Sequence, residues 1–356
     1  MLALLSFFRK LILHKSLLSG IILILIALVV AMMAYVIAPD NSPNANRMIL
    51  EIGGKKPGYR QLFLKIHTST NTDESFMDML FSGKTDAYEW IPITGYVYRG
   101  KNLIVDKYID DGITEKRSYP TESNNIHELI EEKTFLLGTD KFGRDILSRL
   151  IIGTRVSLGV GLIAVILSLT IGILLGAFAG YWGGRTDHVI TWMINVVWSI
   201  PTILLVLGVV MLLGKGYWQV FLAIGLSLWV NVARLVRGQV FSVKEQSYAE
   251  AASIMGFSHY RILFKHILPN IMGPVWVMAA ANFATAIMLE AGLSFLGIGI
   301  PPPQPSWGLM MKEHYNFIIT NNPMLAIIPG IAIMLLVLAF HLAGSGLRDL
   351  LDVRSA

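Results

Sequence analysis

Long apolar runs separated by short polar segments dominate this chain. Six stretches contain no Asp, Glu, Lys or Arg, and they cover residues 17–38, 156–184, 189–214, 216–233, 271–289 and 315–346. A bilayer core about 30 Å thick is crossed by roughly 20 residues of helix. We therefore predict six membrane-spanning helices, with a kink at Pro201 in the third. The fourth run is short and contains Asn231, but without it the two chain ends would lie on opposite sides of the membrane.

The composition supports this prediction. Hydrophobic residues make up 54% of the 356 residues and charged residues only 15%, which excludes an ordinary soluble globular protein. The chain has no cysteine, so no disulfide can stabilise a segment outside the cell. We read the net charge of +5 as a signal of membrane orientation, and we expect membrane lipid and no nucleic acid among the partners.

Basic residues in short segments indicate the orientation of the spans, because such segments stay in the cytoplasm. They precede the first span and fill the segment between the fourth and fifth, at Arg9, Lys10, Lys15, Arg234, Arg237, Lys244, Arg261 and Lys265. Both chain ends are therefore predicted to be cytoplasmic. Arg144, Arg149 and Arg155 lie beside the second span on the predicted outer side and run against this rule. The first run lacks a clear cleavage pattern, so we read it as an uncleaved anchor.

This pattern divides the chain into three parts. They are an N-terminus with the first anchor over residues 1–38, an external insert over 39–137, and a core of five further spans over 138–356 with a cytoplasmic loop at 234–270. The insert has an ordinary soluble composition. Polar and apolar residues partly alternate over 60–67, and 88–108 is rich in strand-forming residues around a break at 99–102. We predict a small α+β fold with a hairpin and a short helix over 125–133.

The sequence contains no complete catalytic or metal-binding pattern. His127 and Glu128 begin a zinc-protease pattern, but Glu131 stands where the second histidine is needed. Gly83-Lys84-Thr85 ends like a phosphate-binding loop, but Asp78 replaces the first glycine. We expect no catalytic residue, no metal ligand and no cofactor in this chain. The spans lack the paired groups of an intramembrane enzyme, whereas a membrane-anchored sensor or scaffold for the insert stays an alternative.

The loop predicted to be cytoplasmic contains signals for the start and the end of a short helix. Ser247 and Glu250 form a capping-box pattern, which predicts a short helix that begins at Ser247. Ala251 and Ala252 favour this helix and keep its surface slim, and Gly256 is expected to end it in a left-handed conformation.

A second short helix is predicted to follow. Ser258 is expected to cap it, and it should pass through Lys265 and His266 and stop near Pro269, because a residue before proline is pushed out of helical geometry. Two short helices joined at Gly256 make a compact projection suited to a groove on a cytoplasmic partner. The alternative is that Glu250 only caps its helix.

Three separated segments resemble one family. They are Leu137-Gly138-Thr139-Asp140-Lys141-Phe142-Gly143-Arg144-Asp145 with the following Gly153-Thr154-Arg155-Val156-Ser157, then Glu250-Ala251-Ala252 through Gly256 with His266-Ile267-Leu268-Pro269-Asn270, and finally Glu290-Ala291-Gly292-Leu293-Ser294-Phe295-Leu296-Gly297 with Ser306-Trp307-Gly308. In these segments the chain resembles the permease subunits of ATP-binding-cassette importers, specifically the C-type subunits of the dipeptide and oligopeptide branch. The resemblance covers residues 137–356, and the insert departs from it.

The resemblance implies a six-helix type I importer permease in a bacterial inner membrane. It implies a second homologous permease, cytoplasmic ATPases that bind ATP and Mg, an extracytoplasmic solute-binding protein, and a peptide substrate. Nickel, glutathione or another small solute is the alternative cargo. The residues that would couple transport to the ATPases are Ser247, Glu250, Ala251, Ala252, Gly256, His266, Leu268 and Pro269. The insert would contact the binding protein, stabilise the second permease, or have no role in transport.

Polar residues at membrane depth are candidates for the translocation path. They are Asn195, Ser199, Asn231, Asn282, Thr285 and Glu290. The competing interpretation is that they hydrogen-bond between helices and only support packing.

Overall fold

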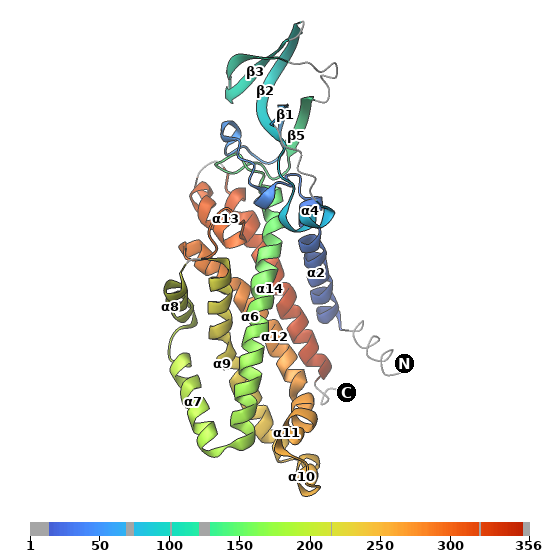
Figure 1. The fold of residues 1–356 in the computed structure, drawn as a ribbon, viewed down its shortest axis with the longest axis vertical. Coiled ribbons are helices and arrows are strands. Elements are labelled where there is room, and N and C mark those ends of the chain that lie inside the picture. The colour runs from blue at the N-terminus through green and yellow to red at the C-terminus, as the bar shows by residue number, and fades with distance from the viewer. Residues whose placement is uncertain are drawn as a thin grey trace, which may run out of the picture. The chain divides into compact units, whose positions relative to one another are not determined.

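The computed structural model describes residues 14–68, 75–99, 102–120, 129–214, 216–319 and 322–351. The chain forms two compact units (Figure 1). One, here called the helical unit, contains Met1–Leu28, Ser157–Pro301 and Ile331–Ala356. The other, here called the sheet unit, contains Val29–Val156 and Pro302–Gly330.

Within the described residues, five continuous helices are long and apolar enough to cross a membrane, so the chain is a multi-pass membrane protein. They are α2 (Lys15–Met32), α6 (Ile146–Trp182), α9 (Tyr217–Lys244), the continuous stretch His259–Leu296 and α14 (Met324–Leu351). Arg9 and Lys10, which indicated the orientation of the first span, lie outside the described residues. Helix α9 extends to Lys244, so residues 234–244, predicted as loop, are helical.

The predicted third span is broken. Helices α7 (Gly184–Trp198) and α8 (Thr202–Leu213) meet at a bend of 91°, and together they make a sixth span only if the pair is counted as one. Pro201 lies at the break, where it lacks an N–H to continue the helix and disfavours helical geometry at Ile200 before it. The predicted kink is therefore a full interruption.

Close helix packing in the helical unit depends on small residues. Gly172, Gly176 and Gly180 recur every fourth position of α6 and face α9. A Cβ atom at Gly172 would lie 2.5 Å from the Cβ of Val232, and one at Gly176 would lie 2.5 Å from the carbonyl oxygen of Ala233. Such spacing lets two helix backbones approach in a membrane, where packing replaces the hydrophobic effect as the driving force.

The sheet unit contains a five-stranded antiparallel sheet in the order β4-β3-β2-β1-β5. Its strands are β1 (Tyr59–His67), β2 (Tyr88–Arg99), β3 (Asn102–Asp110), β4 (Ile113–Pro120) and β5 (Ile130–Phe135). Ile93, Leu103 and Val105 form one buried cluster on this sheet, and Phe63 packs in a second cluster with Ile52 and Phe135. The predicted strands at 60–67 and 88–108 and their hairpin pairing are confirmed, although Gly100 and Lys101 at the break lie outside the described residues.

The predicted helix over 125–133 is wrong for its second half. Residues 130–133 belong to β5 and pair with β1, with Leu62 opposite Glu132 and Phe63 opposite Glu131. Pairing with a neighbouring strand overrides local helix preference here. Residues 125–128, with His127 and Glu128, lie outside the described residues. Glu131 is a strand residue whose carboxylate lies 2.9 Å from the ammonium group of Lys65, so it does not belong to a zinc-protease helix.

The remaining short elements are helices α3 (Ala34–Ile37), α4 (Phe76–Ser82), α10 (Ser247–Ile254), α11 (His259–Arg261) and α13 (Trp307–His314), with single turns of 3-10 helix at Pro43–Ala45, Leu50–Ile52 and Tyr315–Ile318.

Gly143 and Gly54 offer a matched test of steric fit in the sheet unit. Both have φ of +73°, but a Cβ atom at Gly143 would lie 1.8 Å from the carbonyl oxygen of Ile49, whereas nothing lies within 4 Å of a Cβ atom at Gly54. We expect Gly54→Ala to cost roughly 1–2 kcal/mol of stability from the left-handed backbone alone. Gly143→Ala should cost several kcal/mol more. Thermal unfolding of the purified variants measures the difference, and equal midpoints would contradict the close approach at Gly143.

Candidate docking loop and buried ionic cluster

Helix α10 begins at Ser247, as predicted, but the capping box is absent. Gln246 is the N-cap residue, with an extended backbone and no hydrogen bond from its side chain, and Ser247 is already the first helical residue. The carbonyl oxygen of Gln246 accepts hydrogen bonds from the N–H groups of Ala249 (2.9 Å) and Glu250 (3.1 Å). The predicted pairing of Ser247 with Glu250 is therefore wrong, because the helix starts one residue earlier than that motif requires.

The end of α10 follows the prediction. Gly256 has φ of +78°, in the left-handed region. Its N–H donates to the carbonyl oxygen of Ser253 (3.0 Å), and the N–H of Phe257 donates to that of Ala252 (3.2 Å). This pair of bonds defines a Schellman motif, in which glycine avoids the steric penalty of the left-handed residue.

The second predicted helix does not stop near Pro269. It begins after Ser258, whose side chain makes no capping hydrogen bond, as the single turn α11. A π-helical turn over Ile262–Ile267 then leads directly into α12 (Leu268–Leu296). The N–H of Leu268 donates to the carbonyl oxygen of Leu263, five residues earlier. This wider turn and the position of Pro269 in the first turn of α12 let the helix continue where a proline inside a regular helix would disrupt it.

These elements form a projection, here called the docking loop, which consists of residues 245–270. Its base is packed against the long helices: Ala249 and Ala252 are buried in a cluster with Val240, Ile262 and Leu263.

Polar and ring contacts fix the base further. The ammonium group of Lys244 donates to the carbonyl oxygen of Tyr181 (2.6 Å), and the hydroxyl of Tyr181 hydrogen-bonds to Nδ1 of His259 (2.9 Å). The rings of Phe257 and His266 are stacked, with centroids 5.7 Å apart. The docking loop therefore has a rigid attachment to the helices on both sides.

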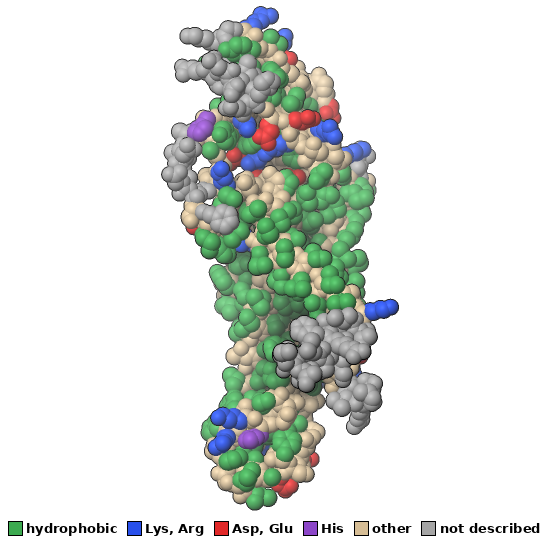
Figure 2. Space-filling model, turned by 90° about the vertical axis from the view of Figure 1, so that its right-hand side faces the viewer, with side chains coloured by type: hydrophobic (Ala, Val, Ile, Leu, Met, Phe, Trp, Pro, Cys, Tyr) green, Lys and Arg blue, Asp and Glu red, His purple; other side chains and the backbone are tan. Residues whose placement is uncertain are grey.

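Its outer surface is apolar and accessible. Ile254 is 83% exposed and Met255 is 66% exposed, and Tyr260, Ala251 and Glu250 are also exposed. A hollow of about 610 Å³ beside them is lined by Trp182, Glu250, His259 and their neighbours. Figure 2 shows apolar, basic and His side chains together at the end of the helical unit that carries α10. Large apolar side chains gathered at one exposed tip are typical of a protein interaction site.

The six candidate path residues do not converge on one site within this chain. Asn195, Ser199 and Asn231 are exposed on α7, its C-terminal cap and α9. Asn282 is buried and donates to the hydroxyl of Ser168 (3.3 Å), which links α12 to α6.

The other two bond within α12. The hydroxyl of Thr285 donates to the carbonyl oxygen of Ala281 (2.9 Å), and the buried carboxylate of Glu290 accepts from the hydroxyl of Ser294 (2.7 Å). Asn282, Thr285 and Glu290 thus have packing contacts, and a path role for any of the six stays a prediction.

A buried ionic cluster in the sheet unit was not predicted. The guanidinium of Arg144 donates to the carboxylates of Asp140 (2.5 Å) and Glu313 (3.0 Å), and the side chains of Arg144 and Asp140 are 2% and 0% exposed. Arg149 is fully buried, and its guanidinium lies 3.8 Å from the carboxylate of Glu313. Arg144 is thus held by hydrogen bonds to structural partners, whereas the buried guanidinium of Arg149 makes only the longer contact to Glu313 and no hydrogen bond among the described residues. Their departure from the orientation rule was the sequence signal from which a buried ionic cluster could have been predicted.

Asp140, Glu313 and His314 also offer three ligand atoms within 4.8 Å of one another. Burial lowers the pKa of His314, so its imidazole favours the neutral form that binds metals. Arg144 already bonds both carboxylates, and a cation would have to compete with this bound guanidinium. The prediction of no metal site stays a prediction.

Comparison with known proteins agrees with this architecture of several apolar helices. Residues 172–355 match the model of the family described as binding-protein-dependent transport system inner membrane component, and the chain belongs to this family. This defines the class as a membrane transport component.

Among curated proteins, the chain is 39% identical over 220 residues to the oligopeptide transport system permease protein OppC of Bacillus subtilis, covering 62% of this chain and 72% of that protein. It is 42% identical to the glutathione transport system permease protein GsiD of Pectobacterium atrosepticum, covering 61% and 71%. It is 43% identical to the dipeptide transport system permease protein DppC of Alkalihalophilus pseudofirmus, covering 60% and 70%. The predicted resemblance to the peptide permeases is confirmed.

Proposed function

We propose that this chain is a permease subunit of an ATP-binding-cassette importer and that, with a second homologous permease, it forms the path for di- or oligopeptides. Family membership and the similarity to peptide permeases support this function. The chain transports and does not itself catalyse a reaction. ATP and Mg would be bound by partner ATPases, and an extracytoplasmic solute-binding protein would deliver the peptide.

The observation that carries the proposal is the docking loop. Its base is fixed by buried alanines and by the hydrogen bond of His259 to Tyr181 of α6, while Ile254 and Met255 are exposed at its tip. Movement of an ATPase that holds the tip would therefore be transmitted to α9 and α12, which flank the loop in sequence. This assigns the coupling role to Ser247, Glu250, Ala251, Ala252, Gly256, His266, Leu268 and Pro269.

This function fixes the orientation. The docking loop and both chain ends would lie in the cytoplasm of a bacterial cell, in its inner membrane, and the sheet unit's insert would lie on the outer side. The relative GsiD carries glutathione in its name, which supports glutathione as the alternative solute.

A pair of isoleucine variants tests the docking role. Ile254 is 83% exposed on the docking loop, whereas Ile319 is 92% exposed in the sheet unit. Burial of an isoleucine in an interface is worth about 1.5–3 kcal/mol, so Ile254→Ser should weaken association with the ATPase about tenfold or more. Ile319→Ser should leave it unchanged.

The measurement is purification through a C-terminal tag from gently solubilised native membranes, followed by mass spectrometry. We expect an ATPase and a second permease with the wild type and with Ile319→Ser, and the second permease with little ATPase for Ile254→Ser. Equal ATPase recovery with both variants would exclude the tip as the docking surface. Recovery of neither partner with the wild type would favour the sensor alternative.

A further inference from the structure

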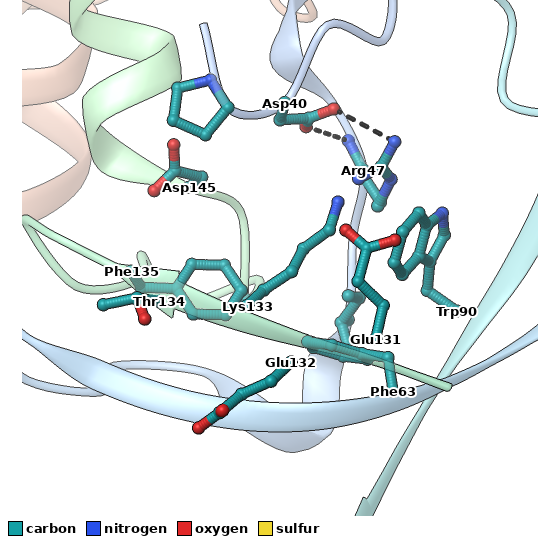
Figure 3. A pocket seen from close by; sticks show the side chains of 13 residues that line it. Asp40, Arg47, Phe63, Trp90, Glu131, Glu132, Lys133, Thr134, Phe135 and Asp145 are labelled. Carbon is teal, nitrogen blue, oxygen red and sulfur yellow. Dashed lines mark hydrogen bonds and ion pairs between the residues drawn. The ribbon is translucent and has the colours of Figure 1, made fainter. Parts of the chain in front are cut away.

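The sheet unit contains a cavity of about 270 Å³ that the transport function does not use. It lies between strands β1, β2 and β5 and the chain segments around Asp40–Ile49 and Gly143–Asp145. Aromatic rings of Phe63, Trp90 and Phe135 form its apolar wall, and charged side chains enter from several sides (Figure 3). Its volume lies just below the usual range for small-molecule pockets, which suits a ligand of a few heavy atoms.

Most of the charged groups in this cavity already have partners. Arg47 pairs with Asp86 and lies 3.5 Å from the carboxylate of Asp40. Glu131 pairs with Lys65 at 2.9 Å. Asp145 accepts hydrogen bonds from the N–H and hydroxyl of Ser148. The side chain of Glu132 points away from the cavity in Figure 3 and is exposed.

Lys133 differs from these groups. Its ammonium group lies 3.6 Å from the centroid of the Trp90 ring, and among the described residues it has no hydrogen bond and no ion pair. The guanidinium of Arg47 lies over the same ring, 4.5 Å from its centroid. Burial, together with the nearby positive charge of Arg47, lowers the pKa of Lys133 to about 8. The carboxylates of Glu131, Asp40 and Asp86 act on this ammonium group through space and partly offset the two effects. Among the described residues, none of them forms an ion pair with it, so the cavity contains a largely buried cation with no anion bound to it.

An anion bound in the cavity would stabilise the charged form of Lys133, which burial disfavours, because an opposite charge within a few ångströms favours the charged form of an amine. The aromatic wall favours an anion with an apolar part. We propose that this cavity binds a small carboxylate, with the carboxylate held by Lys133 and the apolar part against Phe63 and Trp90. An amine is the poorer fit, because the acidic groups that face the cavity are paired or hydrogen-bonded.

The site gives the insert a ligand-binding role that is independent of the docking loop. A small carboxylate in the surroundings would order Arg47, Trp90 and Lys133 around one ligand, and these residues come from three separate chain segments. The binding test below needs no ATPase and no transport, so its result does not depend on the proposed importer function.

The test measures the reactivity of Lys133 in the full-length protein, purified in lipid nanodiscs. Brief acetylation with acetic anhydride between pH 6.5 and 9, read by peptide mass spectrometry, reports the fraction of each lysine in its neutral form. The probes are isobutyrate, its neutral shape match isobutyramide, and the cation tetramethylammonium. Lys116, which is exposed on β4, serves as the internal reference.

We expect saturating isobutyrate to slow acetylation of Lys133 at pH 7 about tenfold, which corresponds to a rise of one unit in its pKa, and to leave Lys116 unchanged. Isobutyramide should have no effect. Equal protection by isobutyrate and isobutyramide, no protection by either, or protection by tetramethylammonium would each overturn the proposal.

Two variants support the assignment. Lys133→Gln should abolish binding of isobutyrate in a calorimetric titration, whereas Glu132→Gln, at the neighbouring position that points away from the cavity, should bind as the wild type does. Undiminished binding to Lys133→Gln would place the carboxylate elsewhere. The wild-type acetylation experiment stands alone if Lys133→Gln fails to fold.

Discussion

Replacing Gly256 by valine should lower peptide uptake at least tenfold while the protein still inserts into the membrane. Gly256 is left-handed, with φ of +78°, and a Cβ atom there would meet nothing within 4 Å. The effect is therefore one of backbone conformation and not of steric clash. A non-glycine residue in this region costs roughly 1–2 kcal/mol, and a β-branched side chain fits it poorly. The cheapest relief is to open the turn, which would displace the tip of the docking loop.

Uptake of a labelled dipeptide by cells that depend on this permease measures the effect. Gly256→Asn is the matched control, because asparagine tolerates left-handed geometry and should keep most of the uptake. Gly238→Val is a second control, because it adds the same side chain inside α9. A Cβ atom there also meets nothing within 4 Å, and φ is not positive. Normal uptake by Gly256→Val, or equal loss in Gly256→Asn, would contradict a role for the left-handed turn.

Replacing Arg144 by methionine should destabilise the protein by about 3–5 kcal/mol, because it leaves two carboxylates without their shared cation. Asp140 is fully buried and the side chain of Glu313 is only 13% exposed, so water cannot replace the guanidinium. The fully buried Arg149 would be the nearest remaining positive charge. We expect a large fall in the thermal unfolding midpoint of the sheet unit and reduced yield from membranes.

The same substitution in an exposed ion pair provides the control. The side chains of Arg117 and Glu115 are 48% and 49% exposed, and their contact is 3.0 Å long. Surface pairs of this kind contribute about 0–1 kcal/mol, so Arg117→Met should leave the unfolding midpoint nearly unchanged. Similar midpoints for Arg144→Met and Arg117→Met would mean that the buried cluster does not hold the sheet unit together.

The buried cluster also changes the interpretation of charge near the second span. Arg144, Arg149 and Arg155 ran against the orientation rule, which treats basic residues as solvated signals. In the structure Arg144 and Arg149 surround Glu313, and the guanidinium of Arg155 donates to the carbonyl oxygens of Leu80 (3.1 Å) and Phe81 (3.3 Å). Arginines committed to structural partners carry no orientation information, so the rule and the positions of these residues do not conflict.

Local pattern was enough to place most elements. The apolar runs predicted the long helices because a membrane span needs only continuous hydrophobicity over a fixed length. Alternation predicted β1, since side chains of a strand point to opposite faces in turn. Strand-forming residues on both sides of a break predicted the hairpin of β2 and β3. Gly256 was found because left-handed geometry at a helix end selects glycine within a few residues of sequence.

Several features depended on contacts that no local pattern encodes. The helix continues past Pro269 because a π turn precedes it, and residues 130–133 are a strand because β1 offers them a partner. Ser247 and Glu250 have the spacing of a capping box, but the helix begins one residue too early to form it, because Gln246 takes the N-cap position.

The sequence by itself therefore determined the membrane class, the approximate spans and the docking loop, because hydrophobicity and glycine geometry act over short stretches of chain. Only the tertiary structure decided the 91° break, the ionic cluster and the cavity around Lys133. Arg144 and Glu313 lie 169 positions apart in the chain. Charge pairing over such a separation leaves no periodic signal in a single sequence, because it depends on where the folded backbone brings the two side chains.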